Sequence, residues 1–336
     1  MGARTIAVAA VVGVCLGVLL TLLYINRRRI YTAVAAAAPD DLPTYFKWKE
    51  RFLVPVRNQK GCAACWALSV CDMMSDTINL RSGGQWGRNH LSPQYLISCW
   101  SGHEGCNTGG SPEGTYDLPQ LTDAGIPLEE EFPYVATDTA PCKAITEGVL
   151  RVRTVKNTGR DLCIDPATVP ENVRQQVIDA NIVRMKKALL NGPIVGTLRV
   201  HEDLYKYDGL AIYQVTPGSR QIGYHAVEVV GWANEEVNFA EPGFDDAYWV
   251  VRSSWGDNWG ARGIRYGFAY VKMGCNEADI ESRASVCEVE MPESVKDAIA
   301  ATDIDTMRYT SYTQYVEDPE RSHFVGAMVK NHAHAT

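Results

Sequence analysis

The chain has 336 residues, of which 46% are apolar, and its formal net charge at pH 7 is −8. This length and apolar content allow one large buried core or two smaller ones. The mildly acidic balance, without a run of five or more like charges, argues against nucleic acid as a partner, because such binding depends on clustered lysine and arginine.

The first predicted element is an apolar segment from Ile6 to Ile25. A helix of about 20 residues is long enough to cross ~30 Å of hydrocarbon. The alternative is a cleavable signal peptide, but its apolar core is usually about 7–15 residues, and the small-residue stretch at Ala33 lies beyond three arginines, Arg27 to Arg29. We therefore expect residues 1–26 to form a single-pass membrane anchor and residues 27–41 a tether.

Two long helices are expected further along the chain. Apolar side chains recur at helical spacing from Trp66 to Leu80, before Gly83 and Gly84, which predicts a long buried helix. A second helix is expected over Val173 to Leu190, before Asn191-Gly192-Pro193 breaks it.

The pattern after that break is typical of strands, because β-branched and aromatic residues alternate with glycines. The expected strands are Ile194–Val200, His225–Trp232, Ala247–Ser253 and Ile264–Lys272. The sequence therefore predicts an α+β fold with a helical half over residues 42–150 and a β-rich half over residues 151–291. A peptide would lie in the cleft between them.

The C-terminal tail, residues 292–336, is polar and weakly patterned, with a short helix expected over Val295 to Met307. It ends in two histidines, His332 and His334, which cannot close a metal site by themselves. We predict neither a metal nor another cofactor.

The chemistry is indicated by one cysteine and one distant histidine. Cys65 lies in Gln59-Lys60-Gly61-Cys62-Ala63-Ala64-Cys65-Trp66-Ala67, and His225 lies in Gly223-Tyr224-His225-Ala226-Val227. A thiol with a pKa near ~8.5 is a poor nucleophile at pH 7, but at a helix N-terminus beside an imidazole it can ionise. This pair predicts a hydrolase; the other interpretation is a buried thiol and a core histidine.

The segment around Cys65 resembles the signature of papain-like cysteine peptidases, Gln-x-Gly-x-Cys-x-x-Cys-Trp-Ala, in which the second cysteine is the nucleophile. Further motifs follow in family order: Leu91-Ser92-Pro93-Gln94, Gly105-Cys106-Asn107, Phe132-Pro133-Tyr134, Asn191-Gly192-Pro193 and Trp255-Gly256. The resemblance extends from Leu42 to Val289 and is closest to the cathepsin B and cathepsin X branches. It implies the papain-like two-domain fold, with a helical left domain, a barrel-like right domain and the active-site cleft between.

The resemblance also implies two disulfides, Cys62–Cys106 and Cys99–Cys142, which need an oxidising compartment. The arginines after the apolar segment instead place the catalytic part on the cytoplasmic face of the membrane. A virus particle or a host endomembrane would reconcile these two inferences. Residues 26–41 leave no room for a folded inhibitory propeptide, so we expect activity to be controlled by other means.

Two further residues receive catalytic roles from the resemblance. Gln59 corresponds to the glutamine whose side-chain amide, with the backbone N–H of the nucleophile, binds the developing oxyanion. Ser253 stands where the family has an asparagine that orients the histidine, since the chain reads Arg252-Ser253-Ser254-Trp255-Gly256. A hydroxyl is shorter and rotates, so we expect reduced but not abolished turnover.

Substrate contacts are expected from four residues. Gly109 and Gly110, after an inserted Thr108, resemble the glycines that pair with the substrate backbone. Trp255 would shield the histidine from water. Arg283, in Ile280-Glu281-Ser282-Arg283, would close the second subsite and favour an acidic or polar substrate residue; the alternative is a solvated arginine.

These observations lead to one main hypothesis and one alternative. The chain is expected to be a membrane-anchored cysteine endopeptidase that cleaves polypeptides through a thioester on Cys65, with His225 as acid and base. Endopeptidase action is expected because the sequence lacks the two-histidine loop with which cathepsin B trims dipeptides. The alternative is a catalytically impaired papain-fold protein, with a peptide-binding or structural role at a membrane or in a virion.

Overall fold

The computed structural model describes residues 42–319, except 88, 101, 103–104, 235–243, 245 and 261–266. The predicted membrane segment and tether lie outside the described residues. Among the helices of the described part, none combines the length and the apolar character that crossing a membrane requires.

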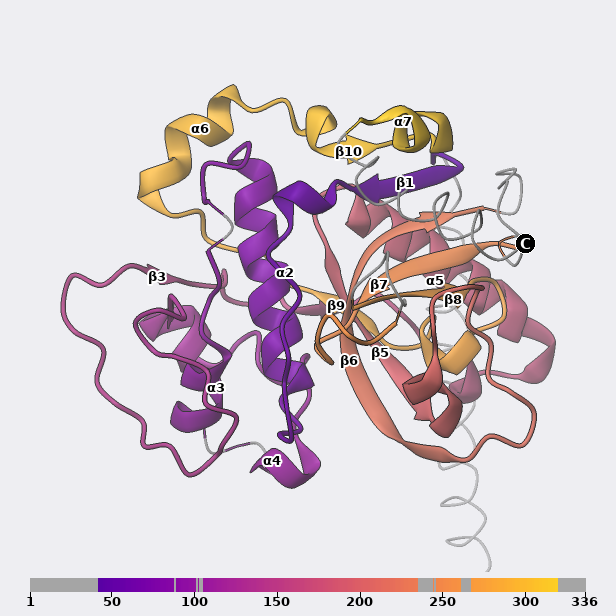
Figure 1. The fold of residues 1–336 in the computed structure, drawn as a ribbon, viewed down its shortest axis with the longest axis horizontal. Coiled ribbons are helices and arrows are strands. Elements are labelled where there is room, and N and C mark those ends of the chain that lie inside the picture. The colour runs from indigo at the N-terminus through magenta and orange to yellow at the C-terminus, as the bar shows by residue number, and fades with distance from the viewer. Residues whose placement is uncertain are drawn as a thin grey trace, which may run out of the picture.

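The first half is built around one buried helix, α2 (Cys65–Arg81), which stands upright in Figure 1. Every residue from Trp66 to Leu80 is buried, including Asp72 and Asp76, so this helix is enclosed on all sides. Polar side chains on such a helix need partners inside the protein. The predicted helix is confirmed, and two shorter helices accompany it: α3 (Pro93–Cys99) and α4 (Gly105–Thr108).

The second half contains a large sheet with the strand order β10-β1-β6-β5-β9-β4, on which β7 pairs with β6 and β8 pairs with β7. The strands of this sheet are β1 (Tyr45–Trp48), β4 (Arg160–Asp161), β5 (Ile194–His201), β6 (Gln221–Ala233), β7 (Tyr248–Arg252), β8 (Phe268–Lys272), β9 (Ala284–Val286) and β10 (Arg308–Tyr309). A separate small sheet pairs β2 (Ile126–Pro127) with β3 (Arg151–Val152).

The expected helix and strands of this half are also present. Helix α5 (Arg174–Leu189) lies within the range predicted for the second helix. Strands β5, β6 and β7 overlap the first three predicted strands, and β8 covers the end of the fourth, part of whose beginning lies outside the described residues. Short 3₁₀ turns span 50–52, 166–168, 171–173, 202–206, 277–279, 293–295 and 304–307, and a π turn spans 120–124.

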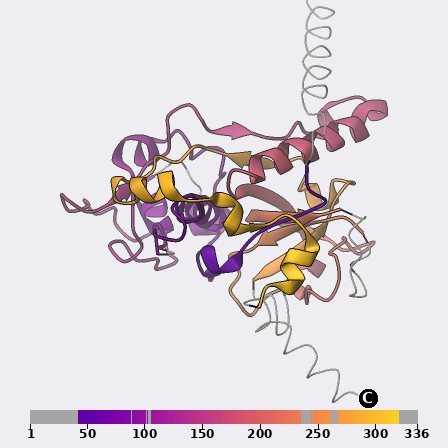
Figure 2. The same cartoon turned by 90° about the horizontal axis from the view of Figure 1, so that it is seen from above.

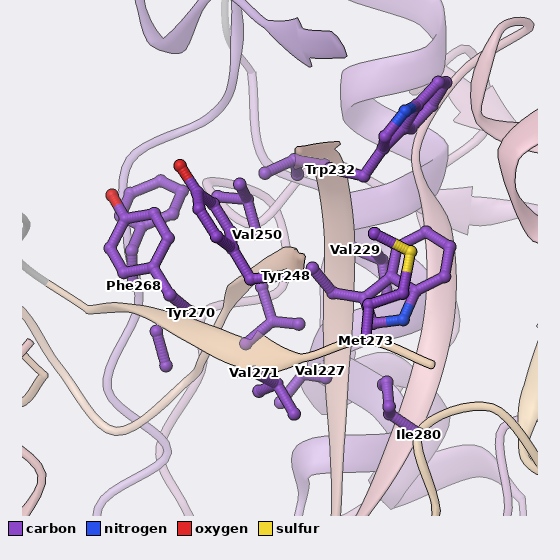
Figure 3. Close-up of a cluster of buried hydrophobic side chains, with 14 of the residues drawn as sticks. Val227, Val229, Trp232, Tyr248, Val250, Phe268, Tyr270, Val271, Met273 and Ile280 are labelled. Carbon is purple, nitrogen blue, oxygen red and sulfur yellow. The ribbon is translucent and has the colours of Figure 1, made fainter. Parts of the chain in front are cut away.

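The core consists of two clusters, one in each half. The first surrounds α2 and includes Trp66, Met73 and Ile78. The second lies on the sheet, where Figure 3 shows aromatic and branched side chains from β6, β7 and β8 together, among them Val229 and Val250. Helix α2 packs against strand β6 where the two clusters meet. This contact brings the motif around Cys65 close to the motif around His225.

The C-terminal segment 292–319 packs across both halves, as Figures 1 and 2 show in yellow. Val295 is buried in the cluster around α2, whereas β10 pairs with β1, with Tyr309 opposite Lys47. The ring of Tyr45 lies 5.7 Å from that of Tyr315 in helix α7 (Tyr312–Glu317). We call residues 292–319 the C-terminal strap, because they connect the two halves.

The short helix predicted over Val295 to Met307 is present, but it does not extend over the whole range. Helix α6 spans only Lys296–Ala301, and the next residue, Thr302, is extended with a ψ of 124°. The Thr302 hydroxyl lies where a side chain on Gly83 would be, because a Cβ added there would be 2.7 Å from this oxygen. The segment thus bends to follow the end of α2 rather than continuing as a helix.

Candidate active site

Cys65 is the first residue of α2, at the point where the preceding loop reaches the second half. The loop is attached to its neighbours by the Cys62–Cys106 disulfide and by the Ala63 N–H, which donates to the Cys106 carbonyl at 2.9 Å. Cys65 as a whole residue is partly exposed. A helix N-terminus carries a partial positive charge, so this position favours a thiolate.

The surroundings of the Cys65 thiol shift its pKa in opposite directions. Burial raises its pKa, whereas the backbone N–H groups of Ala226, Trp66 and Cys65 lower it by hydrogen bonding to the sulfur. Ala226 directly follows His225 on β6. The backbone of β6 therefore lies against the thiol at the predicted histidine.

His225 is 3% exposed and is held by one hydrogen bond and one ring contact. Its Nε2 lies 2.9 Å from Ser253 Oγ, and the Trp255 ring stacks on the imidazole with centroids 4.2 Å apart. Burial lowers the pKa of His225 to about 3. Since Nε2 faces the Ser253 hydroxyl, Nδ1 is the ring nitrogen that can exchange a proton with a thiol.

Ser253 follows the last residue of β7, and its hydroxyl serves two groups. Besides the contact with His225, Ser253 Oγ accepts a hydrogen bond from the Trp255 N–H at 3.2 Å. The hydroxyl can still donate to a neutral imidazole or accept from a protonated one. Ser253 can thus hold both protonation states of the ring, but through a single rotatable group.

Gln59 lies in the loop before Cys65 and is fixed at both ends of its amide. Its Nε2 donates to the Cys62 carbonyl at 3.0 Å, and its Oε1 accepts from Ser254 Oγ at 2.7 Å. A carboxamide has two N–H groups, so one stays available for a ligand. The side chain is oriented by the residue next to Ser253.

Arg252, the residue before Ser253, lies in a buried cluster of charges that joins the two halves. Its guanidinium donates to Asp76 Oδ2 at 2.6 Å and to the Val54 carbonyl at 2.6 Å, and it forms an ion pair with Glu228. Asp76 is on α2 and Glu228 on β6. Strand β6, which carries His225, and strand β7, which ends just before Ser253, are therefore tied to the helix that carries Cys65.

The charges in this cluster determine which carboxyls hold protons. Burial raises the pKa of Glu228 well above its usual range, and it raises the pKa of Asp76 to about 6 although Arg252 opposes this. Asp72 behaves differently: burial would raise its pKa, but Arg57, whose Nη2 is 2.5 Å from Oδ1, and other positive neighbours lower it to about 2.

The two glycines predicted to bind the substrate backbone pack against residues that are close to Cys65 in the chain. Gly109 has a φ of +85°, and a Cβ added to it would be 2.7 Å from the Ala63 carbonyl oxygen. A Cβ added to Gly110 would be 3.1 Å from the Trp66 ring. Any residue other than glycine at position 109 would be strained, because the backbone φ there is in the left-handed region.

A cavity of about 570 Å³ opens next to Gly110 and is lined by both halves. Arg283 lines it, with its guanidinium stacked on the Tyr224 ring at 4.7 Å. Three carboxyl residues, Glu113, Asp161 and Asp165, also contribute to the lining. The predicted position of Arg283 at a subsite is thus compatible with the structure, but the cavity carries more negative than positive groups.

Sequence reasoning missed three residues of this region: Arg252, Ser254 and Tyr205, which stacks on Trp255. A signal for Arg252 was present. Asp72 and Asp76 are one helical turn apart on a helix predicted to be buried, and buried carboxylates require a cation nearby. No pattern in the sequence indicates the other two, because their partners are distant in the chain.

The chain matches the family model described as papain family cysteine protease over residues 42–288. It is 31% identical to tubulointerstitial nephritis antigen-like from Mus musculus over 278 residues, which cover 76% of this chain and 56% of that protein. Cathepsin B-like CP2 from Giardia intestinalis is 30% identical, with 73% of this chain and 74% of that protein covered. The chain thus spans just over half the length of the nephritis antigen relatives that it matches.

Two solved structures have the same fold. Procathepsin B S9 from Trypanosoma congolense aligns with a TM-score of 0.58 at 23% identity, covering 76% of this chain and 80% of that one. The proform of the ragweed pollen protease Amb a 11 aligns with a TM-score of 0.57 at 22% identity, covering 77% and 70%. The predicted papain-like α+β fold is confirmed, and the chain belongs to the papain family of cysteine proteases.

Proposed function

We propose that this protein is a cysteine endopeptidase that cleaves polypeptides through a thioester on Cys65. The observation that supports this most strongly is the position of Cys65 at the start of α2, with its sulfur against the Ala226 N–H, directly after His225. This arrangement allows the imidazole to take the thiol proton and later to return it.

The proposed reaction has two steps. The Cys65 thiolate attacks the scissile carbonyl carbon, and the protonated His225 gives its proton to the leaving amine as the C–N bond breaks. A water molecule then attacks the thioester while His225 accepts its proton, which releases the acid and restores the thiol. In both steps the second N–H of the Gln59 amide, together with the Cys65 backbone N–H, would stabilise the oxyanion.

Substrate is proposed to lie along Gly109 and Gly110 with one side chain in the adjoining cavity. Arg283 would meet an acidic or polar group there, and Glu113, Asp161 and Asp165 would meet a cationic one. A panel of peptides that differ only at this side chain, assayed with wild type and Arg283→Ala, separates these two uses of the cavity. If Arg283→Ala lost cleavage of the acidic peptides but kept that of the others, Arg283 would be the residue that binds the acidic side chain.

The alternative is a papain-fold protein that binds peptides without cleaving them. It is supported by the pKa values, since burial raises that of Cys65 and lowers that of His225, and both shifts oppose a thiolate–imidazolium pair. Some matching relatives are also named as antigens rather than as peptidases.

Labelling of the full chain with an epoxysuccinyl peptide, followed by peptide mass mapping, tests the proposal. Selective alkylation of Cys65 that disappears in His225→Ala would support the peptidase. An unreactive Cys65 in folded protein with its other thiols reduced would favour the binding protein. Cys71 is buried and serves as an internal control, because it should stay unlabelled in both proteins.

We further propose that residues 1–26 anchor the protein in a membrane, with residues 27–41 as a tether. Extraction of expressed protein with alkaline carbonate tests the anchor, since a peripheral protein would be released. Counting of free thiols by mass in the same fraction tests the compartment. Four disulfide-bonded cysteines would indicate an oxidising environment, and ten free thiols would contradict it.

A further inference from the structure

Tyr205 lies close to the proposed site although no motif includes it. It belongs to the 3₁₀ turn Glu202–Lys206 and is 57% exposed. Its ring stacks on Trp255, with centroids 4.7 Å apart and planes inclined by 27°. A side chain that is mostly exposed contributes little to the hydrophobic core. The stacking of Tyr205 on Trp255 therefore needs another explanation.

The turn that carries Tyr205 is held firmly, so the position of the ring is defined. Leu204 is fully buried, and its carbonyl accepts the Trp259 indole N–H at 3.1 Å. Asp203 accepts hydrogen bonds from the Tyr213 hydroxyl at 2.9 Å and from the Thr216 N–H at 2.6 Å. The backbone on either side of Tyr205 is therefore anchored independently of its ring.

The Trp255 ring makes stacking contacts with two other rings, those of Tyr205 and His225. The His225 and Trp255 rings are nearly parallel, at 22°, and Trp259 meets Trp255 edge-on at 4.9 Å. Two stacking contacts thus connect the ring of Tyr205, through Trp255, to the imidazole of His225. Offset and edge-to-face arrangements of this kind are the favourable ones for aromatic pairs.

The stack supplies what the hydrogen bond from Ser253 lacks. The hydroxyl is a short group that rotates and is already shared with the Trp255 N–H. It fixes one atom of the imidazole, whereas a flat ring against the imidazole fixes its plane. His225 and Ser253 are 3% and 4% exposed, and an indole held against the imidazole helps to keep water from the hydrogen bond between them.

We propose that Tyr205 is a positioning residue for catalysis, which holds Trp255 flat against His225 and so compensates for the weak hold of Ser253. This rests on the proposed peptidase function. Tyr205 would act through Trp255 rather than by touching the reacting atoms. A change at Tyr205 should therefore affect the alignment and protonation of Cys65 and His225 more than the affinity for substrate.

Three variants of the full chain test this: Tyr205→Ala, Tyr205→Phe and, as a matched control, Leu210→Ala, which removes another exposed apolar side chain (62% exposed). The rate of Cys65 alkylation by iodoacetamide is measured against pH, with kcat and KM for a short peptide amide. Thermal unfolding of each variant confirms that it is folded. Alkylation reports on the thiolate even where turnover is slow.

Tyr205→Ala should lower kcat about tenfold and change KM less than about twofold. Without the contact between Tyr205 and Trp255 the imidazole can tilt away from the sulfur, and the greater separation weakens the attraction between thiolate and imidazolium. The acid limb of the alkylation profile then moves to higher pH and the alkaline limb to lower pH. Tyr205→Phe and Leu210→Ala should both behave as wild type, because the ring rather than the hydroxyl makes the stack.

A second comparison uses Ser253→Asn, whose longer carboxamide holds His225 more firmly. The loss caused by Tyr205→Ala should be smaller in this background, since the two residues support the same ring. A Tyr205→Ala protein with wild-type pH limbs and kcat, or an equal loss in both backgrounds, would overturn the inference. A wild-type Cys65 that fails to react at all would instead overturn the proposed function.

Discussion

The two halves hold the proposed catalytic pair by different means. Cys65 is fixed by main chain and covalent bonds: the start of α2, three backbone N–H groups and the Cys62–Cys106 disulfide next to it. His225 is on a strand, but its ring is oriented by side chains, Ser253 and Trp255.

This difference predicts where substitutions will matter. Main-chain contacts persist when side chains change, so the surroundings of Cys65 tolerate replacements that keep the glycines and the disulfide. The surroundings of His225 depend on consecutive residues, Arg252 to Trp255, each with its own contact. The departure from the family sequence, Ser253 for asparagine, lies in the second region.

The largest effect is expected where the two halves are joined, because loss of that contact would affect both partners. Arg252→Ala leaves Asp76, whose pKa of about 6 makes it mainly anionic at pH 7, buried without its cation and should lower the free energy of unfolding by about 3–5 kcal/mol. Urea unfolding at pH 7 measures this. Arg199→Ala, which breaks a more exposed pair with Asp279, is the control and should cost about 1 kcal/mol or less. Equal losses would contradict the role of the buried cluster.

On the Cys65 side, the one side chain expected to matter strongly is Gln59. Gln59→Ala removes the proposed oxyanion donor and should lower kcat by about 10²–10³, with Cys65 alkylation unchanged. Steady-state kinetics and alkylation on one preparation measure both. Ser254→Ala, which only frees the Gln59 carbonyl oxygen, should lower kcat by less. If Ser254→Ala matched Gln59→Ala, orientation rather than the donor itself would be the main contribution.

The cluster between the halves also predicts how stability depends on pH. Glu228 and Asp76 have raised pKa values, the latter about 6, so they bind protons more tightly in the folded chain. The stability that they contribute is complete below about pH 4 and is lost as the pH rises through their folded pKa values. Between pH 5 and 8, wild type should lose ~1–3 kcal/mol more unfolding free energy than Glu228→Gln.

Denaturant unfolding at several pH values measures this difference. His225 changes the unfolding free energy with pH in the opposite direction, because its pKa is lowered to about 3. The stability that it contributes is lost as the pH falls below about 6.5. That contribution is the same in both proteins and cancels. Parallel curves from pH 5 to 8 would show that Glu228 does not retain its proton in the folded chain.

The smallest effect tests the His225 side directly. Ser253→Asn offers the carboxamide of the family and should raise kcat about tenfold, which corresponds to ~1.4 kcal/mol. Ser253→Ala, which removes the hydroxyl, should lower it. Steady-state kinetics of the three proteins decide the matter. If Ser253→Asn brought no gain, the hydroxyl would already hold the imidazole as well as an amide does.

Much of the fold follows from local patterns and from the family motifs. The helix that begins at Cys65 and the one that ends at Leu189 have regular apolar spacing, and the strands of the second half are rich in β-branched residues. Pairing between distant segments leaves no local pattern. The strap was therefore predicted as a single helix and a tail, whereas Tyr309 pairs with Lys47.

The candidate site divides in the same way. The positions of Cys65, His225, Gln59 and Ser253 come from motifs, and the structure brings them together through α2, β6 and the end of β7. The contacts of Tyr205 and Arg252 depend on rings and charges that meet only after folding. Single residues of this kind have no spacing that would distinguish them from surface or core residues.

The pairing of β10 with β1 has a consequence for synthesis of the chain. Domains fold progressively as the ribosome makes them, N-terminal parts first. Strand β1 is made early, but its outer edge gains a partner only after residue 309 has left the ribosome. Until then this edge offers free N–H and C=O groups to other chains, a template for aggregation. A ribosome that stalls before residue 308 would therefore release a chain whose sheet is open along β1.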